Sequence, residues 1–140
     1  VFAKNPGIKV LSDNQDAKGS RDGGMAVMQD LLTANPKIDA VFAINDPTGI
    51  GAELAIKQAK RTGIFITAVD GAPDAVVALK DPASLFEGSS AQNPYQMAND
   101  GVKVGYEIMN GKKPAKNVLL LPVPLITKAN LKDYPGWVKE

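Results

Sequence analysis

The sequence has 140 residues, of which 44% are hydrophobic and 22% are charged, a composition typical of a globular domain and not of a disordered chain. Its 16 Lys and Arg against 15 Asp and Glu give a formal net charge of +1, so no charge imbalance indicates nucleic acid or an anionic membrane as a partner. Because the chain contains no Cys and no His, thiolate nucleophiles, Ser–His–Asp triads and the common zinc sites are excluded.

The first residues resemble the last turn of a helix that is stopped by Asn5-Pro6-Gly7. Residues 8–11 are then expected to form a short strand. Since a domain rarely starts on the last turn of a helix, we expect the chain to continue a longer protein upstream.

A polar loop over residues 12–24 leads into the first long helix. Apolar side chains recur there at helical spacing, at Met25, Met28, Leu31 and Leu32. Asn35-Pro36 ends this helix. The almost continuous apolar run over residues 38–44 then predicts a buried strand.

Strands and helices continue to alternate along the middle of the chain. A helical pattern extends to Arg61, residues 64–69 predict a buried strand, and residues 73–80 predict a short helix with Pro near its first turn. Residues 85–91 predict a weaker strand because Gly and Ser interrupt it.

The last part of the chain is less regular. Residues 94–110 predict a longer helix, and residues 118–126 predict an edge strand or extended connection because two prolines interrupt them. A final short helix is expected near Leu131. Alternating strands and helices indicate an α/β fold with a parallel sheet flanked by helices.

Polar side chains follow each predicted strand, at the sheet edge where parallel α/β proteins bind ligands. Amide and carboxylate groups each make two hydrogen bonds, which suits neighbouring sugar hydroxyls. The residues are Asp13 and Asn14, Asn45 and Asp46, Asp70, and Gln92.

Each of these positions also has a structural explanation. Asn45 or Asp46 would cap the next helix, Asp70 would belong to a turn with Gly71, and Gln92 would be a solvated loop residue. Four such positions in succession are less easily explained this way.

A second motif, Gly49-Ile50-Gly51-Ala52-Glu53-Leu54, has the outline of a dinucleotide-binding fingerprint, with Asp70 downstream. It departs from the fingerprint because Leu54 replaces the third glycine. Residues 45–48 also separate the first glycine from the strand, which displaces the helix N-terminus from the pyrophosphate position. Close packing of the helix is the alternative explanation for the glycines.

Three blocks of sequence resemble the C-terminal half of periplasmic sugar-binding proteins of the ribose-binding type, the family shared with the sugar-sensing domains of LacI-type repressors. They are the segments at 39–46 (DAVFAIND), 68–74 (AVDGAPD) and 91–94 (AQNP). The resemblance extends from Ile8 to about Ile126. The segment at 15–24 and the Pro-Gly-Trp ending most resemble fructose-type members.

The resemblance implies that Asn45, Asp70 and Gln92 contact sugar hydroxyls. Asp13, Asn14 and Arg21 are further candidates near the same rim. Many ribose-type members have an aromatic-Asp-Arg segment whose ring stacks on the sugar. The nearest match here is Gly19-Ser20-Arg21, which lacks the ring.

The resemblance also implies a two-lobed protein that closes around its ligand. Residues 1–92 would form the C-terminal lobe, incomplete at its start. Residues 93–114 would be a helix of the N-terminal lobe, and residues 115–140 the return across the hinge and the tail. The missing N-terminal lobe or a second copy of the chain would cover the exposed surfaces.

The leading functional hypothesis is therefore the substrate-binding component of an ABC-type sugar importer in the bacterial periplasm. It would bind a monosaccharide, a pentose or a hexose such as fructose, without catalysis, cofactor or metal. Its other partner would be a membrane permease, and nucleic acid is not expected. The alternatives are the effector-sensing domain of a LacI-type regulator and a nucleotide-binding enzyme.

Overall fold

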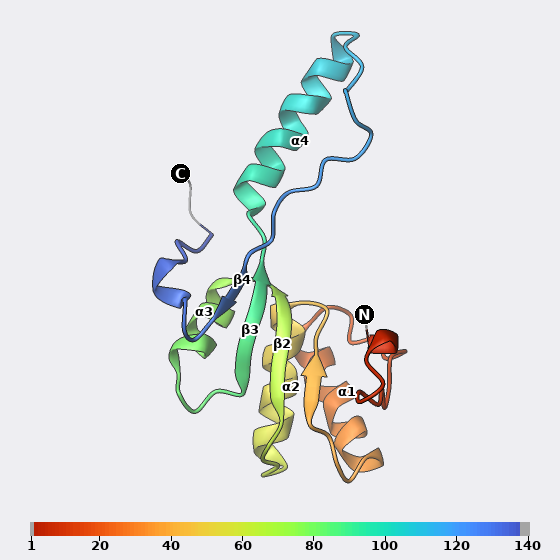
Figure 1. Ribbon diagram of the computed structural model, residues 1–140, viewed down its shortest axis with the longest axis vertical. Helices are drawn as coiled ribbons and strands as arrows, with labels where there is room; N and C mark the ends of the chain where they lie inside the picture. The colour runs from red at the N-terminus through yellow and green to blue at the C-terminus, as the bar shows by residue number, and fades with distance from the viewer. Residues whose placement is uncertain (1, 138–140) are drawn as a thin grey trace.

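The computed structural model describes residues 2–137, which form a sheet with strand order β1-β2-β3-β4 (Figure 1). Strands β1 (Ala40–Phe42), β2 (Phe65–Asp70) and β3 (Phe86–Ala91) are parallel. Strand β4 (Leu125–Thr127) is antiparallel to β3 at the sheet edge. The predicted α/β fold is confirmed, and the antiparallel edge strand makes the sheet mixed.

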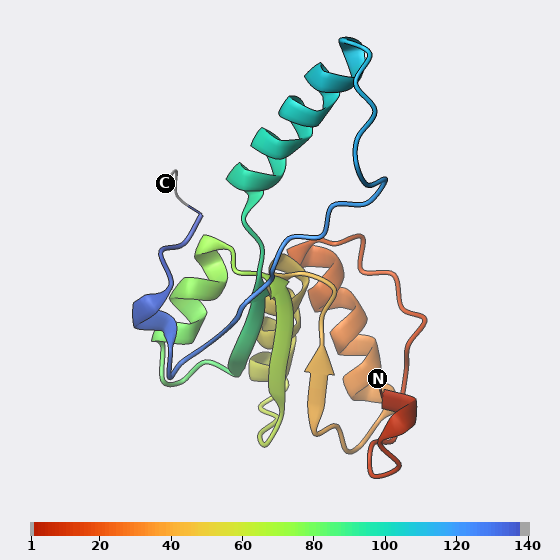
Figure 2. The ribbon, with the colours of Figure 1, turned by 45° about the horizontal axis from the view of Figure 1, so that its top comes forward.

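Three helices lie on one face of this sheet: α1 (Arg21–Ala34), α2 (Asp46–Gln58) and α3 (Pro73–Lys80) (Figures 1 and 2). The hydroxyl of Ser20 caps α1 by accepting a hydrogen bond from the Gly23 amide at 3.1 Å. Since β1, β2 and β3 follow one another in the same direction, right-handed crossovers place α2 and α3 on the same face.

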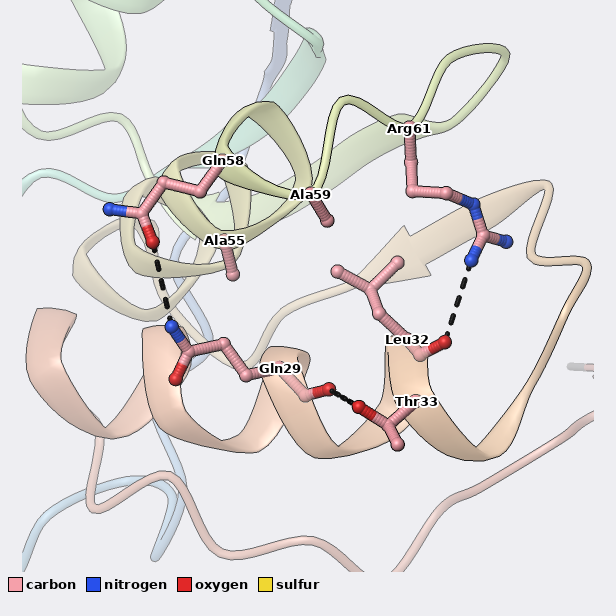
Figure 3. A pocket seen from close by; sticks show the side chains of 7 residues that line it. All are labelled: Gln29, Leu32, Thr33, Ala55, Gln58, Ala59 and Arg61. Atoms are coloured by element: carbon pink, nitrogen blue, oxygen red, sulfur yellow. Dashed lines mark hydrogen bonds between the residues drawn. The ribbon is translucent and has the colours of Figure 1, made fainter.

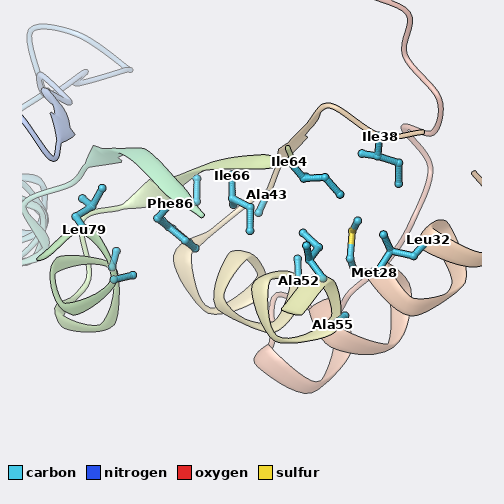
Figure 4. Close-up of a cluster of buried hydrophobic side chains, with 14 of the residues drawn as sticks. Met28, Leu32, Ile38, Ala43, Ala52, Ala55, Ile64, Ile66, Leu79 and Phe86 are labelled. Carbon is cyan, nitrogen blue, oxygen red and sulfur yellow. The ribbon is translucent and has the colours of Figure 1, made fainter. Parts of the chain in front are cut away.

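The hydrophobic core lies between the sheet and these helices (Figure 4). Met28 from α1, Ile56 from α2, Ile66 from β2 and Phe86 from β3 are all fully buried. Side chains alternate along β2, so that Ile66 faces the helices while Phe65 is 47% exposed. The opposite face of the sheet is therefore open among the described residues.

Apolar side chains remain exposed on this open face and near the free edge of the sheet. Phe42 of β1 is 62% exposed and Ile44, just after β1, is 72% exposed. The ring of Phe2, from the short 3-10 helix Phe2–Lys4, meets Phe42 edge to face with centroids 6.4 Å apart.

The fingerprint-like glycines of α2 are explained by close packing. A Cβ on Gly51 would lie 1.9 Å from the Arg21 carbonyl oxygen of α1, and one on Gly49 would lie 2.6 Å from the Phe86 ring. Helix α2 therefore packs tightly against α1 through one glycine and against the sheet through the other.

The predicted strand at residues 8–11 is wrong, because this segment forms no ladder with β1 or any other strand. Ile8, Val10 and Leu11 are each more than 40% exposed. A strand requires a partner for its backbone groups, whereas here the Ile8 amide donates to the Asn5 carbonyl in a turn. The predicted strand over residues 38–44 is also shortened to β1.

The chain leaves the sheet after β3 to form α4 (Pro94–Met109), which has no buried residue and extends away from the other helices (Figures 1 and 2). Residues 110–124 return beside α4 without forming a strand, and β4 follows. The 3-10 helix η2 (Leu131–Asp133) then packs near α3. Val1 and residues 138–140, which the predicted segments include, lie outside the described residues.

No helix within residues 2–137 combines the length and the apolar character needed to cross a membrane.

Candidate functional site

The carboxyl ends of β1, β2 and β3 meet at one edge of the sheet, the edge from which α4 departs (Figure 1). Asn45 follows β1, Asp70 is the last residue of β2, and Gln92 directly follows β3. The structure therefore places all three at the same edge. The Gln92 side-chain amide donates a hydrogen bond to Oδ1 of Asp70 at 2.7 Å.

Asn45 caps α2 and also anchors the preceding loop. Its Oδ1 accepts from the Thr48 amide at 3.0 Å, and its Nδ2 donates to the Gly19 carbonyl at 3.0 Å. An amide oxygen accepts two hydrogen bonds and an NH₂ group donates two, so each end of the side chain retains capacity for a ligand. Capping and ligand binding are thus compatible at this residue.

Asp70 has an unusual backbone conformation at the end of β2. Its φ is +131°, in a region that residues with a side chain rarely adopt. Such a conformation costs about 1–3 kcal/mol and persists only where the surroundings impose it. Gly71 follows with φ +67°, so the chain turns sharply from β2 toward α3.

The carbonyl groups of this turn are held by donors from distant parts of the chain. The Asp70 carbonyl accepts from the Gln92 backbone amide at 2.8 Å and from the Trp137 indole Nε1 at 3.0 Å. The Gly71 carbonyl accepts from the Tyr134 hydroxyl at 2.8 Å.

The amide groups of the same turn donate to two buried side chains. The Gly71 amide donates to the Ser89 hydroxyl oxygen at 3.0 Å, and the Ala72 amide donates to Oδ2 of Asp46 at 2.7 Å. Ser89 in turn donates to Oδ1 of Asp46 at 2.7 Å. Asp46 and Ser89 are fully buried, so this network forms the floor beneath the turn.

Burial raises the pKa of Asp46, and the nearby charge of Asp70 adds to this rise. The hydrogen bonds from Ser89 and Ala72 oppose it. Burial also raises the pKa of Tyr134, with a further contribution from the charge of Asp46. The charge of Asp70 therefore influences the pKa of Asp46, and the charge of Asp46 influences the pKa of Tyr134.

Sequence reasoning missed most of the residues that support this turn. It considered Asp46 only as a strand-end residue or a cap, and it did not select Ser89, Tyr134 or Trp137. Tyr134 and Trp137 lie more than 60 positions from the residues that they contact, and no local pattern marks such a pairing.

The remaining candidates are exposed. Arg21, at the start of α1, forms an ion pair with Asp74 in the first turn of α3, which keeps its guanidinium at the same edge of the sheet. Asn14 accepts a hydrogen bond from the Gln15 side chain at 3.2 Å, within the loop before α1. Within residues 2–137, no hydrogen bond joins Asp13 or Asn14 to the residues at the strand ends.

A shallow hollow of about 400 Å³ lies at the opposite end of the molecule, between the last turns of α1 and α2 (Figure 3). Its polar side chains are already paired: Gln29 donates to Gln58 at 3.5 Å, and Arg61 donates to the Leu32 carbonyl at 3.4 Å. We do not assign it a ligand, because it lies away from the strand ends and its polar groups are used.

A second hollow, of about 460 Å³, borders Gln92. Its walls are α4 and the returning chain, including Met97, Val104 and Leu120. No group of His, Cys, Asp or Glu side chains in the described part of the chain converges in a way that would hold a metal ion.

Comparison with known proteins shows which family the sequence matches. The sequence model of the family described as "Periplasmic binding protein domain" matches residues 1–113. The ribose import binding protein of Salmonella typhimurium is 38% identical over 100 residues, covering 71% of this chain and 33% of that protein. The xylitol-binding protein of Mycolicibacterium smegmatis is 36% identical over 132 residues, covering 94% of this chain and 37% of that protein.

Among solved structures, the periplasmic solute-binding protein of an ABC transporter from Actinobacillus succinogenes, with bound D-allose, superposes with a TM-score of 0.83 at 27% identity. The match covers 95% of this chain and 46% of that chain. The present chain thus spans about a third of the length of these two curated relatives and less than half of this solved structure.

Proposed function

Because the chain belongs to the family of periplasmic binding protein domains, we propose that it is part of the sugar-binding component of an ABC-type importer. In this function it binds and releases a monosaccharide without chemistry, outside the cytoplasm, and the loaded form contacts a membrane permease. The named relatives and the solved structure are a ribose, a xylitol and a D-allose binder, which supports a pentose, hexose or related polyol as ligand. The resemblance to fructose-type members stays a prediction.

The observation that carries this proposal is the carboxylate of Asp70, held on a strained turn at the edge where three parallel strands end. In the proposed site Asp70 accepts hydrogen bonds from sugar hydroxyls, while Gln92 and Asn45 each donate and accept. Arg21 is a further candidate at the same edge, and Asp13 and Asn14 are candidates on the neighbouring loop.

The proposal includes a division of the chain between two lobes. Residues 1–92 belong to one lobe, residues 93–114 to a helix of the other, and residues 115–140 return to the first lobe as the tail. The absence of buried residues in α4 and its projection from the sheet support this division. The chemistry of the ligand-binding face is then completed by a lobe outside this chain.

The test is a binding panel on the full-length protein with ribose, xylitol, fructose, glucose, galactose and NADH. A ligand present at about 100 times its dissociation constant stabilises the fold by roughly 2.7 kcal/mol, which gives a clear thermal shift. We expect a shift with one class of sugar and none with NADH. A shift with NADH alone would contradict the proposal and favour the nucleotide-binding alternative.

Asp70→Ala tests the site itself. We expect the affinity for the sugar that binds to fall about 10- to 100-fold, the usual effect of removing a charged hydrogen-bonding partner. The matched control is Asp30→Ala, which removes an exposed carboxylate from α1. Isothermal titration calorimetry that gives equal dissociation constants for wild type and Asp70→Ala would exclude Asp70 from the site.

A further inference from the structure

We propose that the C-terminal segment formed by residues 131–137 is a positioning element for the sugar site, in which Tyr134 and Trp137 act through Asp70. This inference rests on the proposed function, because it concerns the same carboxylate. Neither residue is expected to touch the sugar. Their role is to fix the turn that aims Asp70.

The two peptide units of the turn are each held at both ends by side chains. The first unit joins Asp70 to Gly71: its carbonyl accepts from the Trp137 indole, and its amide donates to Ser89. The second unit joins Gly71 to Ala72: its carbonyl accepts from the Tyr134 hydroxyl, and its amide donates to Asp46. One side of each unit is thus held by the buried floor and the other by the C-terminal segment.

This arrangement explains how Asp70 is kept at φ +131°. Pairing of β2 with β3 extends to the Asp70 carbonyl, which accepts from the Gln92 backbone amide, and the four side chains hold the polar groups of the two peptides after Asp70. Without the C-terminal donors, the Asp70 carbonyl keeps the Gln92 backbone amide and the Gly71 amide keeps Ser89, but the Gly71 carbonyl loses the Tyr134 hydroxyl, so the turn is held less firmly. Asp70 then relaxes toward the conformation preferred by residues with a side chain, and its carboxylate leaves Gln92.

Tyr134 and Trp137 lie 63 and 67 positions from the turn residues that their side chains contact. Tyr134 is half-buried and Trp137 is 43% exposed, so neither is a main component of the hydrophobic core. The segment that carries them follows β4, which itself follows the return from α4. The position of Asp70 therefore depends on the packing of residues 131–137, which lie near the C-terminal end of the chain, against the turn.

The experiment compares Tyr134→Phe and Trp137→Phe in the full-length protein, using titration calorimetry with the sugar that binds in the panel. Both substitutions keep an aromatic ring and remove one hydrogen-bond donor. We expect each to weaken binding about fivefold, the factor that corresponds to the loss of one hydrogen bond. Thr33→Val is the matched control, because it removes one hydrogen-bonding hydroxyl, which donates to the Gln29 carbonyl at 2.9 Å, from the exposed last turn of α1, away from the sugar site.

A double-mutant cycle separates positioning from a general effect on the fold. In the Asp70→Ala background, Tyr134→Phe should change the dissociation constant less than about twofold, because the carboxylate on which it acts is gone. A spectroscopic measurement is independent of this cycle. The indole N–H resonance of Trp137, identified by its loss in Trp137→Phe, should shift when sugar is added to the wild type.

The outcomes distinguish this inference from the proposed function. If Asp70→Ala binds sugar as tightly as wild type, the proposed site is wrong. If Asp70→Ala weakens binding while both aromatic variants bind like wild type, the site stands and the positioning role is overturned. The positioning role is also overturned if the aromatic variants weaken binding equally with and without the Asp70 carboxylate, or if the indole resonance does not move.

Discussion

At the scale of single residues, Asp70 combines a carboxylate at the sheet edge with a backbone angle that opposes its own preference. Its neighbours satisfy every polar group of the following two peptide units, and these hydrogen bonds compensate for the strain. The carboxylate that is proposed to bind sugar therefore belongs to a residue whose backbone conformation is strained and depends on these hydrogen bonds.

The strain at Asp70 predicts an unusual order of stability for two substitutions. Glycine adopts positive φ freely, so Asp70→Gly should be more stable to urea than Asp70→Ala by about 1 kcal/mol or more. Both variants lack the carboxylate, so its contacts cancel in the comparison. At Thr67 of β2, where φ is negative, the same pair of substitutions should show the ordinary order, with Ala more stable than Gly.

The buried carboxylate of Asp46 predicts a pH-dependent stability. Its pKa in the folded state is raised above the ordinary value of 3.8, so the folded state binds this proton more tightly than the unfolded state. The protonated Asp46 carboxyl thus contributes fully to the free energy of unfolding below pH 3.8, and this contribution is lost as the pH rises through the raised pKa. We expect Asp46→Asn to remove this loss, because the Asn side chain does not ionise and its NH₂ group and carbonyl oxygen can take the places of the two carboxylate oxygens beside Ser89 and the Ala72 amide.

We therefore expect the free energy of unfolding of Asp46→Asn, measured by urea denaturation, to exceed that of the wild type at neutral pH. The difference should shrink as the pH falls toward 4. A difference that is independent of pH would contradict the buried, raised pKa of Asp46.

Strand order and strand ends were sufficient to predict that Asn45, Asp70 and Gln92 share one edge. Their hydrogen bonds were not predictable, because Ser89, Tyr134 and Trp137 reach the turn from positions far away in the sequence. The hydrophobic pattern indicates which element a residue belongs to. It does not indicate which side chain of another element it meets.

At the scale of elements, hydrophobic spacing and breakers predicted the long helices well, and the bounds of α3 agree with the prediction at 73–80. Residues 8–11 are mostly apolar, like the residues of the strands, but form no strand, because a strand also needs a neighbouring strand to pair with. The role of the glycines of α2 likewise could not be predicted from the local sequence alone. Their spacing matches a nucleotide-binding motif, and only the neighbouring α1 and β3 reveal that they permit close packing.

The close approach of α1 and α2 predicts opposite effects for the same substitution in two helices. Gly51→Ala places a methyl group against the α1 backbone and should destabilise the fold by about 1–3 kcal/mol or more. Gly101→Ala in α4 meets no atom within 4 Å and should be neutral, or stabilising by up to about 1 kcal/mol through helix propensity. Thermal denaturation of both variants of the 140-residue chain checks this, and equal effects would mean that α1 and α2 do not approach so closely.

At the scale of the whole molecule, two parts differ in how they are stabilised. The sheet with α1, α2 and α3 has a shared core, whereas α4 extends from it and has no buried residue. The open face of the sheet also exposes Phe42, Ile44 and Phe65. Exposed apolar surface of this kind is expected to be covered by another part of the protein or by a second copy.

Hydrogen exchange tests this difference directly. In the 140-residue chain, amides of α4 should exchange at least about tenfold faster than those of α2, because no tertiary packing protects them. In the full-length protein, α4 should become protected to a similar extent. Strong protection of α4 in the 140-residue chain alone would contradict the assignment of this helix to another lobe.

The two connections between the sheet and α4 leave it side by side. The Ala91 amide at the end of β3 donates to the Pro124 carbonyl just before β4, at 2.8 Å, so the outgoing and returning chains are joined at their base. Pro94 and Pro124 further stiffen the chain beyond this point. The two connections that carry α4 are therefore tied together where they leave the sheet, and we expect them to move together when α4 moves relative to the sheet.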